Sequence, residues 1–137
     1  MTAAAENFPH VPPEAVPHLD GFIRHFVAKE KQGRWRSVYS MKPKKWNGVS
    51  AYDCSEPELA DWNTPPLDTL TKHNMAKYLD TPGFIFPVGH SADLPYRGTL
   101  RDALLGNDSV TECVVSLEPG KLAVCYGHSG ELRICRH

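Results

Sequence analysis

The closing segment, residues 112–137, constrains the fold more than any other part of this chain. It contains three short apolar runs separated by two glycine-containing turns, one at Pro119 and Gly120 and one at residues 128–130. This pattern predicts three antiparallel strands connected as a meander. A sheet of this kind must bury one face, so the rest of the chain is expected to supply helices that cover it.

The two turns also predict which side chains share a face of this meander. A two-residue turn pairs Glu118 with Lys121 and places Cys113 opposite Tyr126, and a three-residue loop with Gly130 left-handed keeps the third strand in phase. The core face is then expected to comprise Cys113, Val115, Leu117, Leu122, Val124, Tyr126, Leu132 and Ile134. The opposite, mostly solvent-exposed face would comprise Glu112, Ser116, Glu118, Lys121, Cys125, Glu131, Arg133 and Cys135.

This register decides what is expected of the cysteines. Cys113 should be separated from Cys125 and Cys135 by the thickness of the sheet, and no two of the four cysteines have CxxC spacing. A structural zinc site needs four converging ligands, so neither a metal site nor a cofactor is predicted. An alternative left open places Cys125 and Cys135 as diagonal neighbours with a redox or metal role, with His137 nearby. The simpler interpretation is two small side chains on a half-covered face.

The N-terminal half begins with the clearest helical pattern in the chain. Pro17 suits the first turn of this helix and Gly33 suits the position just past its end. Residues 34–42, "RWRSVYSMK", alternate between apolar and polar side chains, which predicts a half-buried strand. The apolar positions that form one helical stripe before it are Leu19, Phe22, Ile23, Phe26 and Val27.

The middle of the chain predicts shorter elements. Residues 43–66 contain four prolines and are expected to form mostly loop, with a short strand considered near residues 49–52. Residues 67–79 predict a second helix and "GFIFPV" a short buried strand. "TLRDALLG" predicts a compact helix, with Thr99 and Asp102 in capping-box spacing and Gly106 at its end.

These elements together predict an α+β fold in one domain. With 137 residues, 41% of them hydrophobic, the chain can bury one modest core. We expect a flexible N-terminal arm at 1–13 and a single domain at 14–137, with two or three helices on one face of an antiparallel sheet that includes residues 34–42. No run approaches the roughly 18 apolar residues of a membrane helix, and no secretory leader is visible. A cytoplasmic protein without a membrane partner is therefore expected.

Charge is distributed unevenly, although the whole chain is nearly neutral at −1. Residues 29–46 contain seven Lys or Arg and one Glu, whereas residues 47–70 contain five acidic residues and no Lys or Arg. Such polarity can steer an acidic partner to the first segment or a basic partner to the second. The expected binding residues are Arg34, Trp35, Arg36, Lys42, Lys44, Lys45, Trp46, Asp53, Glu56, Glu58 and Asp61, with Trp46 as an aromatic anchor.

One short motif suggests catalysis. "FIFPVGHSAD" resembles the nucleophile elbow of the α/β-hydrolases over about six residues. It departs from that elbow at Asp93, where the second glycine belongs, and at Pro87, which interrupts the strand. His90, Ser91 and Asp93 are therefore weak catalytic candidates, and a structural turn is the simpler interpretation.

The sequence thus predicts a small non-catalytic binding protein that neutralises or regulates a protein partner. Bacterial immunity and antitoxin proteins have this size and simplicity, which is an analogy of class only. Two alternatives stay open. One is a small hydrolase-like enzyme that uses His90, Ser91 and Asp93. The other is a nucleic-acid-binding protein that uses the basic and aromatic residues of 29–46.

Overall fold

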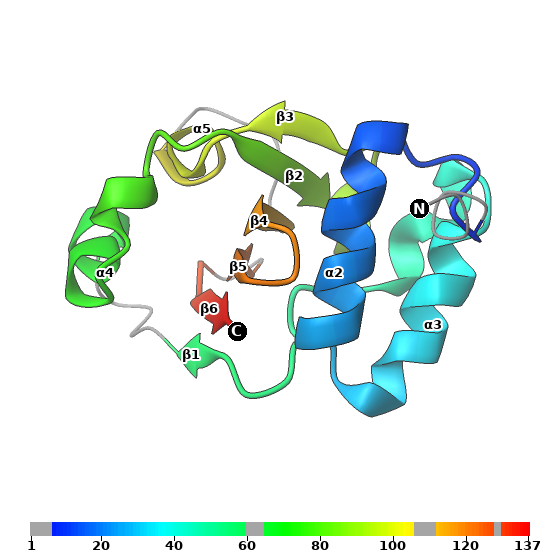
Figure 1. The fold of residues 1–137 in the computed structure, drawn as a ribbon, viewed down its shortest axis with the longest axis horizontal. Coiled ribbons are helices and arrows are strands. Elements are labelled where there is room, and N and C mark those ends of the chain that lie inside the picture. The colour runs from blue at the N-terminus through cyan, green and yellow to red at the C-terminus, as the bar shows by residue number, and fades with distance from the viewer. Residues whose placement is uncertain (1–6, 60–64, 106–111, 128–129) are drawn as a thin grey trace.

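The computed structural model describes residues 7–59, 65–105, 112–127 and 130–137. Within them a six-stranded antiparallel sheet has the strand order β1-β6-β5-β4-β2-β3 (Figure 1). The expected α+β domain with a C-terminal meander, β4-β5-β6, is therefore confirmed. The strands are β1 (Glu58–Leu59), β2 (Gly83–Pro87), β3 (Tyr96–Gly98), β4 (Cys113–Glu118), β5 (Leu122–Tyr126) and β6 (Leu132–Arg136).

Helices cover both faces of this sheet, not one face as the sequence predicted (Figure 1). Helices α2 (Val16–Phe26) and α3 (Lys29–Tyr39) pack over the side chains of Val114, Ala123 and Cys125. Residues of α4 (Pro66–Lys72) and α5 (Leu100–Leu105) belong to a second core on the opposite face, with Val115 and Val124. The helical elements are η1 (Pro13–Ala15), α2 (Val16–Phe26), α3 (Lys29–Tyr39), η2 (Pro43–Gly48), α4 (Pro66–Lys72), η3 (Ala76–Tyr78), η4 (Gly89–Ser91) and α5 (Leu100–Leu105).

The meander has nearly the predicted register. Cys113 lies opposite Tyr126, and Gly130 has the expected positive φ of 91° in the loop after β5. His128, in the same loop, lies outside the described residues. The first turn differs, because a bulge near Glu118 pairs this residue with Leu122 and not with Lys121. The bulge absorbs one residue, so the predicted core face is retained, with Tyr126 partly buried at its end.

The face predicted to be mostly solvent-exposed is instead largely buried. Ser116, Cys125 and Cys135 are at most 2% exposed, because α2 packs directly on the sheet. His18 of α2 hydrogen-bonds to Ser116 through Nδ1 and Oγ at 2.7 Å. Small side chains on this face allow the helix to approach closely, so the meander lies inside the molecule and not at its surface.

The predicted strand at 34–42 is wrong. Residues 29–39 form α3, and Gly33, predicted to follow a helix, lies inside it. Trp35, Val38 and Tyr39 are the buried residues of α3, a spacing of three and four that a helix places on one face. The preceding helix, α2, ends at Phe26, after which Val27 adopts an extended conformation and forms an isolated bridge to Cys54.

Other segments match their predictions in part. Phe8 and Val11 are buried in the core, so the predicted arm is packed from residue 7 on, whereas residues 1–6 lie outside the described residues. Residues 51 and 52 form a turn, not a strand. The helix predicted at 67–79 is divided into α4 and η3 near Asn74, which has a positive φ of 59°.

The capping box of α5 is confirmed. The Asp102 amide donates to Thr99 Oγ1 at 3.1 Å, and the Thr99 amide donates to Asp102 Oδ2 at 3.2 Å. Gly106, predicted to end this helix, lies outside the described residues. Among the described helices, none combines the length and the apolar composition needed to cross a membrane.

Candidate functional site

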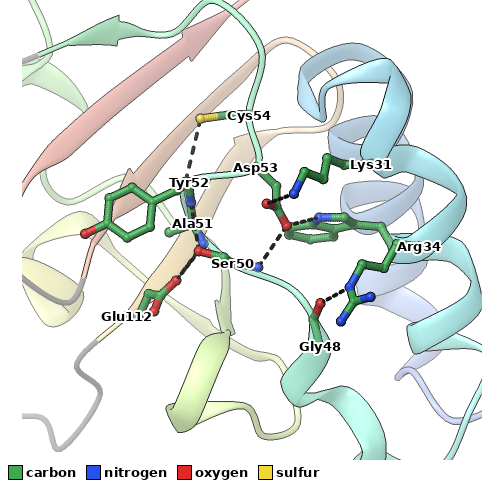
Figure 2. Close-up of polar contacts among 10 residues, drawn as sticks. Lys31, Arg34, Gly48, Ser50, Ala51, Tyr52, Asp53, Cys54 and Glu112 are labelled. Carbon is green, nitrogen blue, oxygen red and sulfur yellow. Dashed lines mark hydrogen bonds and ion pairs between the residues drawn. The ribbon is translucent and has the colours of Figure 1, made fainter.

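A cleft of about 590 Å³ opens between α3, the segment at 47–53 and the turn η4. Figure 2 shows how the polar side chains of α3 and of this segment point toward one another at its wall. The segment lies where three elements meet. Its carbonyls accept hydrogen bonds from Arg34 of α3 and from the Gly89 amide of η4, and its Ala51 amide donates to Glu112, just before β4. The lining residues are Lys31, Arg34, Asn47, Gly48, Val49, Ser50, Tyr52, Asp53, Gly89, His90 and Glu112.

Asp53 fastens the cleft segment to α3. Its Oδ2 accepts hydrogen bonds from Trp35 Nε1 at 2.9 Å and from the Ser50 amide at 3.0 Å (Figure 2). Its Oδ1 lies 3.7 Å from Lys31 Nζ. Because each carboxylate oxygen has a partner within the protein, Asp53 holds the cleft wall together and presents little free negative charge to a ligand.

Glu112 fastens the other end of the same segment. This buried carboxylate, 6% exposed, accepts hydrogen bonds from Ser50 Oγ at 2.9 Å and from the Ala51 amide at 2.7 Å. Gly89 packs against it with a positive φ of 61°, and a Cβ at this position would lie 2.4 Å from Glu112 Oε1. Only glycine fits here, so the turn η4 can close over the carboxylate.

Two cationic side chains and one histidine at the cleft remain exposed to solvent. Lys31, Arg34 and His90 are exposed, and Arg34 donates through Nε to the Gly48 carbonyl at 2.5 Å. Two lysines of η2, Lys44 and Lys45, and Lys42 just before it continue this positive surface and make no ion pair with another described residue. We define the basic face as Lys31, Arg34, Lys42, Lys44 and Lys45.

The tryptophans predicted to bind a partner lie inside the protein. Trp35 is 1% exposed and Trp46 is 0% exposed, and Trp46 Nε1 donates to the Met41 carbonyl at 2.9 Å. Arg36, also predicted to bind, is paired with Asp20 through Nη1 and Oδ1 at 3.0 Å. These side chains support α3 and η2 from within, and Trp46 cannot act as an aromatic anchor while the fold is intact.

The predicted acidic half of the binding surface is dispersed. Asp53 is used inside the cleft wall, and Glu58 is paired with Arg136, at 2.5 Å, and with His73, at 3.6 Å. Glu56 is exposed in a turn with a positive φ of 48°. Asp61 lies outside the described residues. Of the predicted acidic binding residues that the structure describes, Asp53 and Glu58 are thus paired within the protein, and they do not form one acidic surface.

The catalytic candidates are not assembled into a catalytic arrangement in the described residues. His90 is exposed at the cleft, whereas the exposed Asp93 accepts a hydrogen bond from the Leu94 amide at 2.7 Å through Oδ1. No described hydrogen bond or ion pair joins His90 to Asp93. The side chain of Ser91 lies outside the described part of the structure.

A cluster of three cysteines lies behind the cleft segment. The sulfur atoms of Cys54, Cys125 and Cys135 are all within 4.8 Å of one another. Hydrogen bonding with Cys125 and Cys135 lowers the pKa of Cys54 to about 4, with the nearby Arg133 charge contributing. The same hydrogen bonds and full burial raise the pKa of Cys125. Cys54 is thus the most acidic thiol of the cluster.

Sequence reasoning missed this cluster because Cys54 was not assigned to any element. The diagonal placement of Cys125 and Cys135 that the sequence left open is observed, and Cys113 does lie in the core of the opposite face. Cys54 reaches them from the segment after η2, where it forms an isolated bridge with Val27, a long-range contact with no local sequence signal.

Comparison of this chain with known protein families, with curated proteins and with solved structures finds no match.

Proposed function

We propose that this chain is a small binding protein whose basic face takes up an acidic segment of a protein partner. The strongest support is that the acidic side chains at the cleft are hydrogen-bonded within the protein, whereas its cationic side chains are exposed. Asp53 and Glu112 are satisfied by internal hydrogen bonds, whereas Lys31 and Arg34 reach solvent. Lys31 is only partly balanced by Asp53, at 3.7 Å, and Arg34 bonds the neutral Gly48 carbonyl, so an incoming carboxylate meets net positive charge.

A protein partner fits this surface better than a small molecule does. Pockets for small molecules are mostly apolar and aromatic, with a few polar groups, whereas this cleft is lined largely by charged and polar side chains. Lys42, Lys44 and Lys45, at and just before η2, carry the basic face beyond the cleft. A folded partner can use this wider area, and electrostatic steering of its acidic residues raises the association rate.

The two alternatives have less support. Binding to single-stranded nucleic acid needs exposed aromatic rings for stacking, and Trp35, Tyr39 and Trp46 are all buried. A hydrolase needs a base held close to its nucleophile and an acid behind the base, and no described contact orients His90 in this way. Neutralisation or regulation of the partner, as in immunity and antitoxin proteins, remains the proposed role.

A pair of charge-matched variants tests this proposal. In the first, Arg34, Lys44 and Lys45 are replaced by Gln. In the control, Lys72, Lys77 and Lys121, exposed lysines on other surfaces, are replaced by Gln, so that both proteins lose the same charge. Immobilised wild type and both variants are used to capture proteins from cells that produce this chain, and the retained proteins are quantified by mass spectrometry.

We expect one acidic protein to be retained by wild type and by the control and to be lost from the basic-face variant. Raising the salt concentration should weaken its retention, because exposed charges are screened. Equal retention by both variants would show that the basic face is not the binding surface. Retention of nucleic acid with a steep logarithmic salt dependence would favour the nucleic-acid alternative.

A further inference from the structure

Three separate segments bring sulfur atoms to one point beneath α2 and α3. Cys125 pairs with Arg133 and Cys135 with Ala123 across β5 and β6, which places both thiols on the same face as diagonal neighbours. Cys54 directly follows the segment at 47–53 that lines the cleft, and Figure 2 shows it beyond Asp53. All three sulfur atoms lie within 4.8 Å of one another.

The backbone, and not the thiols, determines where Cys54 lies. Cys54 forms an isolated bridge with Val27, and the Ser55 amide donates to the Phe26 carbonyl at 2.7 Å. On the other side, the Ala28 amide donates to the Asp53 carbonyl at 2.9 Å. With the other two cysteines on paired strands, the three side chains are held on rigid elements, as a ligand site requires.

We propose that Cys54, Cys125 and Cys135 form a three-thiolate site for one thiophilic metal ion with a filled d shell, Zn²⁺ or Cu⁺. Metal–sulfur bonds of about 2.3 Å place the sulfur atoms about 3.8 to 4.0 Å apart. The sulfur atoms lie within 4.8 Å of one another, at most about 1 Å beyond this spacing, which side-chain rotations can close. Each thiol that binds the ion releases its proton to solvent.

The donor set selects the class of metal. Among the described residues, no histidine or carboxylate joins the three sulfur atoms. Thiolates alone favour soft ions and disfavour Mg²⁺ and Ca²⁺, which prefer oxygen ligands. Three thiolates complete a trigonal Cu⁺ site, or they hold Zn²⁺ with a fourth position open on the side of Cys54, which is only partly buried.

Arg133 supplies a second observation that favours a charged occupant. Its guanidinium lies 4.3 Å from the centre of the Tyr52 ring, and its buried Nη1 makes no hydrogen bond to a described residue. Nη1 also lies 3.8 Å from the Glu131 carboxylate, which shares the charge of Arg133. Arg133 lies opposite Cys125 across β5 and β6. Three thiolates leave one net negative charge with Zn²⁺ and two with Cu⁺, so zinc places less uncompensated charge in this buried site.

Metal titration of the whole chain tests this inference independently of the basic face. Reduced, metal-free protein is titrated with Co²⁺, whose thiolate complexes give a charge-transfer band in the near ultraviolet. In separate experiments under oxygen-free conditions, the protein then competes with a coloured chelator for Zn²⁺ and for Cu⁺. The variants are Cys54→Ala and Cys135→Ala, and Cys113→Ala, on the opposite face of the sheet, is the matched control. Circular dichroism checks that each variant folds.

We expect one ion per chain, the charge-transfer band, and a rise in unfolding temperature when Zn²⁺ or Cu⁺ is present. Loss of an outer-shell partner typically weakens metal affinity about 10- to 100-fold, so loss of a ligand at Cys54 should weaken it by roughly a hundredfold or more. Cys113→Ala should bind as wild type does. The site is disproved if Co²⁺ gives no thiolate band, if Cys54→Ala binds as tightly as Cys113→Ala, or if neither Zn²⁺ nor Cu⁺ is bound.

Discussion

At the scale of single residues, Glu112 has the most demanding environment at the cleft. A buried carboxylate is costly unless hydrogen bonds compensate for the water it loses. Ser50 Oγ and the Ala51 amide both donate to its Oε2, and Ala51 is itself buried. Glu112 thereby joins the start of β4 to a segment more than sixty positions earlier in the chain, and this link shapes the wall on which the cations are displayed.

Glu112→Ala should therefore destabilise the protein. The change leaves the buried Ala51 amide without its acceptor, which costs about 1–3 kcal/mol in free energy of unfolding. Urea unfolding followed by tryptophan fluorescence measures this loss. The control is Glu118→Ala, an exposed position in β4, which should change stability by about 0.5 kcal/mol or less. If both variants unfold at the same urea concentration, Glu112 does not support the cleft wall.

At the scale of elements, α2 and α3 differ in how closely they approach their neighbours. Gly21 of α2 contacts the turn between β4 and β5, where a Cβ would lie 2.6 Å from the Gly120 nitrogen. Gly33 of α3 has no atom within 4 Å of the position its Cβ would take. Glycine is thus required for packing in α2, whereas in α3 it only weakens the helix.

Alanine at these two positions should act in opposite directions. Gly33→Ala should raise the free energy of unfolding by about 0.5–1 kcal/mol, because alanine has less backbone freedom to lose and meets no obstacle. Gly21→Ala should lower it by about 1–3 kcal/mol, because backbone must move to admit the methyl group. Thermal and urea unfolding measure both changes. If Gly21→Ala left the free energy of unfolding unchanged, the close packing of α2 against the turn would be contradicted.

The sequence predicted the meander better than it predicted α3, for a physical reason. Gly130 and the alternating residues around Val124 specify one register, since a slip by one position would turn every side chain to the other face. In α3 the spacing of four between Trp35 and Tyr39 fits both a strand and a helix. Val38 distinguishes them, because it fits the helical face and violates the alternation.

At the scale of the whole molecule, the sheet is covered on both faces, and this changes which residues are available for function. The second face of the meander was predicted to be exposed because local alternation does not show which distant segments cover it. Burial of this face brings Cys125 and Cys135 toward Cys54 and moves Trp35 and Trp46 into the core. The cations at 34 and 42–45 were predicted as binding residues from charge alone, whereas the contribution of Lys31 and His90 to the cleft depends on tertiary structure.

The central claim is that the cleft receives an acidic group, and an NMR titration tests it most directly. Isotopically labelled protein is titrated with a short oligoglutamate peptide, with an oligolysine peptide as the control. The account predicts amide shifts at Gly48, Ser50 and Gly89 with oligoglutamate only, reduced when Arg34, Lys44 and Lys45 are replaced by Gln. Shifts confined to another surface, such as the exposed edge strand β3, or equal shifts in the variant would contradict it.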